Sequence, residues 1–103
     1  SNVAGTIPNK EILFLDMKKI TFPLLLRPPN PGERFRPYNG PGKKKISRYL
    51  AEKKIEARKR MGYPVLVSNT SVIALPGLQI CPKVRVTEET KNILTIELIN
   101  ESS

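Results

Sequence analysis

Apolar residues near the N-terminus form short runs that predict strands. Residues 11–16 have the length of a buried strand, and after a brief turn residues 20–27 predict a second one. Pro23 cannot donate a ladder hydrogen bond, so it indicates an edge position or the first residues of that strand. Phe14 and Phe22 sit inside these runs, which favours core packing over a role as base-stacking platforms.

A helical period appears in the middle of the chain. Ile46, Tyr49 and Leu50 fall at i, i+3 and i+4, which predicts a helix over 43–54 with one apolar face. Ile55 is out of phase with that face and indicates a break. A second short helix is expected over 56–61, with Glu56 and Arg60 positioned to pair at i, i+4 and Gly62 as its C-terminal stop.

The C-terminal third returns to a period of two. Residues 64–68 and 71–75, separated by Asn69-Thr70, predict a hairpin, and a further strand is expected over 78–86. In 94–98, Leu and Ile alternate with Thr and Glu, as in a half-buried strand. The order of strands, helices and strands predicts the α+β class.

Between the first strands and the helix, residues 28–42 are rich in Pro and Gly, which excludes a helix there. Arg34, Arg36 and Tyr38 give this segment an amphipathic character that flexible linkers lack, so we expect an ordered loop that presents cations. Arg34 has two equally weighted readings, as a ligand-binding cation or as a brace that pairs with Glu33.

Charge is concentrated in one stretch. Residues 27–60 hold twelve of the 18 Lys and Arg residues and three of the nine acids, so the net charge of +9 resides there. Such a field attracts polyanions, and nucleic acid is the usual partner, although a solvated Lys-rich helix face needs no ligand. By length, 11–100 form one domain, and 1–10 are expected to be a tag remnant and linker stub.

Several kinds of chemistry are excluded by composition. The chain contains no His and a single Cys, so it holds neither a Ser-His-Asp triad nor a structural zinc site. It has no phosphate-binding Gly loop and no paired carboxylates. Its longest apolar runs are far below a membrane span, it shows no leader, and its lone Cys81 fits a cytoplasmic setting. We expect binding rather than catalysis, with no cofactor or metal.

A series of motifs then points to one family. In order they are FLD at 14–16, LLLR-x-x-x-PGERFRP, GKKK-x-S-x-x-L, R-x-x-x-P-VLV, ALPG and VTEET. Over about residues 12–99 the chain closely resembles the C-terminal domain of bacterial tRNA(Ile)-lysidine synthase. The resemblance implies a small β-sandwich-like mixed sheet with one or two short helices, similar to a domain of the phenylalanyl-tRNA synthetase beta subunit.

The same resemblance implies a function. The full enzyme is an ATP-dependent ligase that joins lysine to the wobble cytidine of the CAU-anticodon isoleucine tRNA. Its N-terminal catalytic domain binds ATP, and its C-terminal domain binds the acceptor-stem region of the tRNA. For this chain, the cations assigned to tRNA binding from the family motifs and the charge pattern are Arg34, Arg36, Lys43, Lys44, Lys45, Arg48 and Arg60.

Two other classes of function stay open at this point. The chain could be an interdomain or protein–protein docking module whose basic face is incidental, or a free-standing protein that binds DNA or ribosomal RNA. Arg and Lys next to a Pro-Gly loop suit the phosphates and 2′-hydroxyls of an A-form stem, and only Tyr38 suits stacking on a single strand. A salt-dependent preference for tRNA over duplex DNA separates these hypotheses.

Overall fold

The computed structural model describes residues 10–37 and 42–99, and it has the α+β class that the sequence predicts. Both α-helices fall within 43–61, as expected. The elements in chain order are β1 (Lys10–Asp16), the 3₁₀ helix η1 (Met17–Lys19), β2 (Leu24–Arg27), β3 (Arg34–Phe35), β4 (Lys44–Lys45), α1 (Ile46–Glu52), α2 (Ala57–Arg60), β5 (Val65–Ser68), β6 (Ser71–Leu75), β7 (Gln79–Ile80), the 3₁₀ helix η2 (Pro82–Val84) and β8 (Ile93–Ile99).

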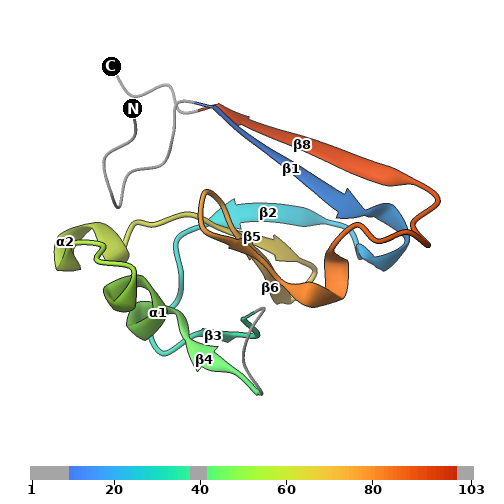
Figure 1. The fold of residues 1–103 in the computed structure, drawn as a ribbon. Helices are drawn as coiled ribbons and strands as arrows, with labels where there is room; N and C mark the ends of the chain where they lie inside the picture. Colours follow the sequence, from blue (N-terminus) through green and yellow to red (C-terminus); the bar gives the residue numbers. More distant parts are fainter. Residues whose placement is uncertain (1–9, 38–41, 100–103) are drawn as a thin grey trace.

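A four-stranded sheet in the order β2-β5-β6-β7 forms the centre of the domain. The β1–β8 ribbon lies on one side of it, and α1 with the β3–β4 hairpin lies on the other (Figure 1). This layering confirms the sandwich-like arrangement that the family resemblance implied. Every strand pairing among the described residues is antiparallel, rather than mixed as expected.

The central sheet separates two apolar clusters. Val65, Val67 and Val72 face α1 and β3, whereas Leu66 and Ile73 face the β1–β8 ribbon. The hairpin strands are therefore buried on both faces, because each face of the sheet is covered by another layer. The turn between them places Asn69 at φ 58°, a conformation that Asn tolerates well.

The first strand is half exposed, which corrects the expected burial of Phe14. Residues of β1 alternate: Leu13 and Leu15 face the central sheet, while Phe14 is 53% exposed. Phe22 is also exposed, at 56%, just before β2. β1 pairs along its length with β8 and makes one further bridge, from Leu15 to Arg85, and no layer among the described residues covers the ribbon's outer face.

The second predicted strand is shorter than expected. It begins at Leu24, directly after Pro23, and forms the edge of the central sheet. The Pro-based prediction of an edge position is thus confirmed. Residues 20–23 are not part of the strand, although Ile20 is buried against the ribbon-side cluster.

The lysine run is not helical, which corrects the predicted start of the helix at residue 43. Lys44 and Lys45 form β4, paired with β3, and Lys45 has extended backbone angles. The Ile46 N–H donates to the Glu33 carbonyl at 2.9 Å, so the chain turns into α1 only there. The predicted inward face of Ile46, Tyr49 and Leu50 is confirmed.

The break after α1 is also confirmed, with Lys54 at φ 65° ending the helical path. The expected Glu56–Arg60 pair is wrong: the Arg60 Nε donates to the Ile55 carbonyl at 2.8 Å. The Glu56 carboxylate instead lies 3.6 Å from the Nε of Arg58. Gly62 follows α2 without a left-handed φ, so it is not the stop that was expected.

The strand predicted over 78–86 is interrupted. It divides into β7 and η2, because Pro82 has no N–H to continue a ladder. Residues 87–90 form a turn, in which the Thr90 N–H donates to the Thr87 carbonyl at 3.1 Å. The predicted alternating burial of β8 is confirmed.

Candidate nucleic-acid interface

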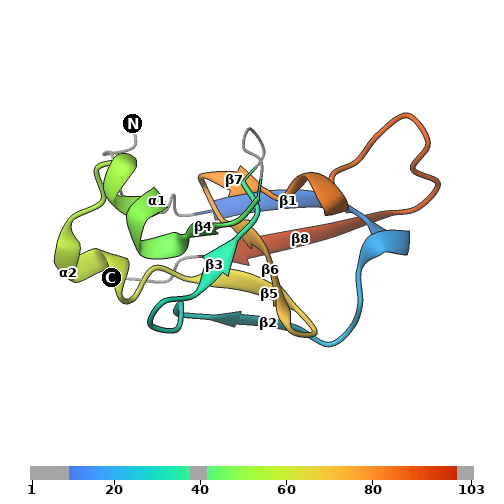
Figure 2. The same ribbon diagram turned by 90° about the horizontal axis from the view of Figure 1, so that it is seen from below.

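Five of the seven cations predicted to bind tRNA lie together. They line an open concavity of ≈ 490 Å³, here called the basic concavity, whose described lining consists of Arg34, Lys43, Lys44, Lys45, Arg48 and Glu52. They come from β3, β4 with the residue before it, and α1, which lie next to one another on the same side of the central sheet (Figure 2). Such an arrangement attracts a polyanion.

The pairing of β3 with β4 explains how the chain presents these side chains. Arg34 is opposite Lys45, and Phe35 is opposite Lys44. Because neighbouring residues of a strand point to opposite faces, burial of Phe35 leaves Arg34 in solvent. The Phe35 ring meets the Tyr49 ring edge to face with centroids 5.0 Å apart, which fixes the hairpin on α1.

Helix α1 contributes in the same manner. Its apolar face is buried, so Arg48 lies on the solvent face, one turn before Glu52. Glu52 forms an ion pair with Lys44 across the concavity. The hydrogen bond from Lys44 holds the pKa of the Glu52 carboxyl below its usual range. Among the described residues, Arg34, Lys43, Lys45 and Arg48 form no ion pair, although the charge of Arg48 also helps to lower the pKa of the Glu52 carboxyl.

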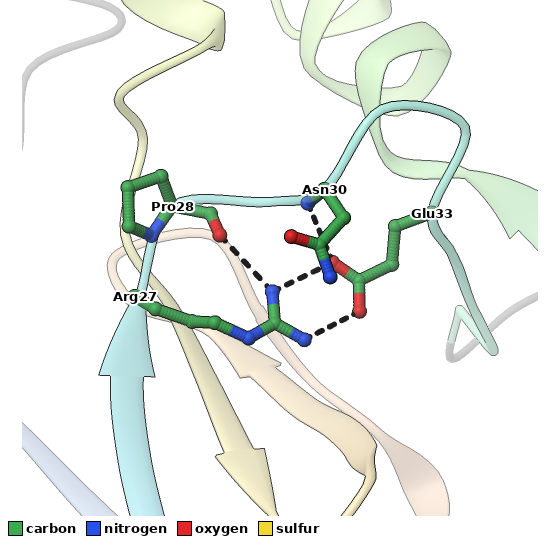
Figure 3. Close-up of polar contacts among 4 residues, drawn as sticks. All are labelled: Arg27, Pro28, Asn30 and Glu33. Carbon is green, nitrogen blue, oxygen red and sulfur yellow. Dashed lines mark hydrogen bonds and ion pairs between the residues drawn. The ribbon is translucent and has the colours of Figure 1, made fainter.

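Of the two equally weighted interpretations of Arg34, the brace to Glu33 is not formed, because another arginine takes that carboxylate. Arg27 at the end of β2 forms a two-pronged pair with Glu33: Nη1 donates to Oε1 at 2.8 Å and Nη2 to Oε2 at 2.7 Å (Figure 3). Nη1 also donates to the Pro28 carbonyl, and the Asn30 N–H donates to Oε1 at 2.9 Å.

This pair has clear electrostatic consequences. Its hydrogen bonds hold the pKa of Glu33 below, and that of Arg27 above, their usual values. It closes the Pro-Gly turn between β2 and β3, where Gly32 has φ 75°, and Glu33 in turn holds the start of α1 through its carbonyl. Sequence reasoning missed Arg27; the available signal was an Arg and a Glu at either end of a Pro-rich turn.

Two predicted tRNA-binding residues lie outside the basic concavity. Arg36 follows β3 and lines the neighbouring cleft instead. Arg60, on α2, is partly buried and its Nε bonds the Ile55 carbonyl, which gives it a structural role in holding the break between the helices. Tyr38, the candidate for stacking, lies outside the described residues.

The described residues hold no group of three or more metal-ligating side chains. None of the helices in this part of the chain is both long and apolar enough to cross a membrane. The site is an array of cations, and such an array can bind anions.

Two solved structures share this fold. The crystal structure of the TilS C-terminal domain superposes with a TM-score of 0.69 at 19% identity, covering 99% of this chain and 78% of that one. An N-terminal fragment of the phenylalanyl-tRNA synthetase β-subunit from Pyrococcus horikoshii gives a TM-score of 0.68 at 22% identity, covering 86% and 28%. The chain is thus a small α+β domain of the type found in these two proteins.

Residues 24–98 match the family model described as the TilS substrate C-terminal domain, and the chain belongs to this family. The tRNA(Ile)-lysidine synthase of Parabacteroides distasonis is 31% identical over 91 residues, which cover 88% of this chain and 21% of that protein. The synthase of Symbiobacterium thermophilum is 32% identical over 78 residues, covering 76% and 16%. The chain therefore spans about a fifth of the length of these relatives. The resemblance drawn from the motifs is confirmed.

Proposed function

We propose that this domain is the tRNA-binding C-terminal part of a tRNA(Ile)-lysidine synthase, and that it binds the acceptor-stem region through the basic concavity. The observation that carries the proposal is the convergence of Arg34, Lys43, Lys45 and Arg48, which form no ion pair among the described residues, on one open surface. The family membership supplies the context, since the relatives are named as synthases that modify a tRNA.

The shape and chemistry of the concavity suit an RNA stem. The major groove of A-form RNA is too narrow for side chains, so proteins contact its phosphates and the 2′-hydroxyls of its wide minor groove. Arginine and lysine side chains serve that purpose without reading sequence. We therefore expect binding that depends on shape and salt rather than on individual bases.

Under this proposal the covalent chemistry belongs to another part of the parent protein. An N-terminal catalytic domain binds ATP and joins lysine to the wobble cytidine of the CAU-anticodon isoleucine tRNA in the cytoplasm. The domain described here has no cofactor of its own, and its partners are the tRNA and that catalytic domain. Its contribution is to raise the affinity for tRNA and to orient it.

Titration of the domain with tRNA at several salt concentrations tests the proposal. Neutralisation of about four to six phosphates gives a slope of log K against log salt near −3 to −5. The variant Lys43→Ala/Lys45→Ala/Arg48→Ala is expected to flatten this slope by about 3 and to bind at least about tenfold more weakly at low salt. Lys44 is left in place because its pair with Glu52 supports the hairpin.

The matched control is Lys18→Ala/Lys59→Ala/Lys91→Ala, which removes the same charge at exposed positions that do not line the basic concavity. It is expected to lower the affinity slightly, through net charge alone. A slope that is flat in the unaltered domain, or equal losses in the two triple variants, would reject the tRNA-binding assignment and favour the docking module.

A further inference from the structure

Beside the basic concavity lies a second hollow of ≈ 470 Å³, here called the polar cleft. It runs between the β3–β4 side of the domain and the β5–β6 turn, and it ends at η1 and η2, which contact each other. Its volume is within the range of about 300–1,000 Å³ typical of small-ligand sites. The two hollows share Arg34 and Lys43, so they form one continuous surface.

Five cations border the polar cleft. Three come from the segment around β3 and β4, and two come from parts of the chain that are distant in sequence: Arg34, Arg36, Lys43, Lys19 and Lys83. No ion pair among the described residues involves any of the five. Lys19 lies in η1 and Lys83 in η2, so the contact between these two turns places the two lysines at the same end of the cleft.

One carboxylate, that of Glu33, lines the cleft, but it does not repel an anion there. Glu33 is held by both terminal nitrogens of Arg27, so its charge is compensated within the protein. The field in the cleft is therefore set by the five cations. A cleft of this charge favours a ligand that carries one or more phosphate groups.

Neutral hydrogen-bonding groups complete the lining at the β5–β6 turn. Ser68 is fully engaged with the Thr21 backbone, since its Oγ accepts from the N–H at 2.8 Å and donates to the carbonyl at 2.7 Å. The exposed side chains of Asn69, Thr70 and Ser71 make no hydrogen bond within the described part of the chain and line the cleft. Hydroxyl and amide groups next to cations are the usual contacts to phosphate and sugar oxygens.

Cys81 borders the cleft but offers no chemistry. Its thiol is buried and donates to the Val72 carbonyl at 3.4 Å. Burial raises the pKa of this thiol to about 11, so it stays protonated at neutral pH. The polar cleft is thus equipped to bind a ligand and not to react with it.

We propose that the polar cleft binds a phosphate-bearing nucleotide unit of the same RNA strand that lies on the basic concavity, and that Lys19 and Lys83 hold its phosphate. This inference rests on the proposed function, because it extends the RNA surface rather than adding a separate ligand. The phosphate is either an internal backbone phosphate or a 5′-terminal phosphate, and both present the same oxygens to the two lysines.

The test uses the variant Lys19→Ala/Lys83→Ala and a matched control, Lys18→Ala/Lys91→Ala, which changes the net charge equally at exposed positions that do not line the polar cleft. Both are titrated with tRNA at several salt concentrations, with thermal melts to verify folding. The cleft variant is expected to flatten the slope of log K against log salt by about 2 and to weaken binding about 10- to 50-fold at 0.1 M salt. The control is expected to keep the slope of the unaltered domain.

A second arm distinguishes the two phosphate sources. A short acceptor-stem RNA is compared with and without its 5′-phosphate. A 5′-terminal phosphate in the cleft predicts that removing this group weakens the unaltered domain and leaves Lys19→Ala/Lys83→Ala unchanged, whereas an internal phosphate predicts equal binding of the two RNAs by each protein. Either result agrees with the proposal, provided that Lys19→Ala/Lys83→Ala flattens the slope of log K against log salt as expected above.

The result that overturns the inference is a folded cleft variant whose affinity and salt slope equal those of its control. If Lys43→Ala/Lys45→Ala/Arg48→Ala still loses binding in the same assay, only the polar cleft is rejected. If that variant also binds normally, the proposed function itself fails. The two failures are therefore distinguishable.

Discussion

Arg27 and Glu33 show how a single pair of side chains can orient the basic concavity, which neither of them lines. The carboxylate accepts from two nitrogens of Arg27 and from the Asn30 backbone, while the Glu33 carbonyl accepts from the first residue of α1. The pair thereby links the edge strand β2 to the hairpin and helix that carry the cations. It also explains why Arg34, next to Glu33 in sequence, keeps its charge for a ligand.

Replacement of Glu33 by Gln is expected to lower the free energy of unfolding at pH 7 by about 1–2 kcal/mol, because a charge-assisted pair of partly buried groups is lost. The pKa of Glu33 is lowered in the fold, so its contribution is present above the unfolded value of 4.5 and disappears as pH falls through the folded value. Urea denaturation at pH 7 and near pH 2.5 measures both effects.

At low pH the Glu33→Gln variant and the unaltered domain are expected to converge in stability. Glu56→Gln is the control, since Glu56 is exposed and its nearest cation is 3.6 Å away, and it is expected to change stability by less than about 0.5 kcal/mol. A stability difference between Glu33→Gln and the unaltered domain that stays constant with pH would contradict the assigned electrostatic role.

At the scale of single elements, β1 shows how a strand divides its side chains between core and solvent. It pairs with β8 along its whole length, and its register places Leu15 opposite Leu94 and Phe14 opposite Thr95. Only the residues facing the central sheet are covered. An unbroken apolar run in sequence therefore has two different environments in the fold.

Leu15→Ala is expected to destabilise the domain by about 2–5 kcal/mol, because Leu15 is fully buried and its truncation leaves a cavity. Phe14→Ala, one residue earlier, is expected to cost less than about 1 kcal/mol despite the loss of a larger side chain, since that ring is mostly in solvent. Chemical denaturation of the two variants measures the difference. Equal destabilisation would mean that the outer face of the ribbon is covered in solution.

The hairpin of β3 and β4 is the second element with a clear division of roles. Phe35 anchors the hairpin against Tyr49, whereas the neighbouring lysines and arginines stay outside the apolar core. An extended lysine run keeps like charges further apart than a helix does, since successive strand residues point to opposite faces. Only Lys45, the N-cap of α1, lies directly at the helix N-terminus.

Over the whole molecule, the elements that carry the basic concavity, β3, β4 and α1, lie on the opposite side of the central sheet from the β1–β8 ribbon (Figure 1). The basic concavity and the polar cleft together gather cations from η1, β3, β4, α1 and η2. A surface built from this many elements is rigid only when the domain is folded. Its selectivity should therefore depend on the shape of the nucleic acid.

We expect the domain to prefer tRNA over a DNA duplex of similar length by about fivefold or more at equal salt, because each hydrogen bond to a 2′-hydroxyl contributes about 1 kcal/mol. Competition of labelled tRNA with either unlabelled nucleic acid measures the ratio, and an RNA hairpin with the same stem sequence as the DNA serves as control. Equal competition by DNA and RNA would favour a general nucleic-acid binder over a tRNA-specific domain.

Much of the fold follows from local patterns in the sequence. The spacing of Ile46, Tyr49 and Leu50 predicted the buried face of α1, and the alternation in 94–98 predicted the half-buried β8. The concentration of charge in 27–60 predicted where the cations of the basic concavity would come from. These features depend on residues a few positions apart, so periodicity and composition are sufficient to find them.

The tertiary structure alone decided which cations are bound within the protein and which are left without an ion pair at the surface. Arg27 rather than Arg34 takes Glu33, Lys44 takes Glu52, and Arg60 bonds the Ile55 carbonyl. Strand register left Phe14 in solvent, and the contact of η1 with η2 brought Lys19 and Lys83 to one cleft. Ion pairs form between groups within about 4 Å, and turns and sheet register set those distances, which spacing along the chain does not encode.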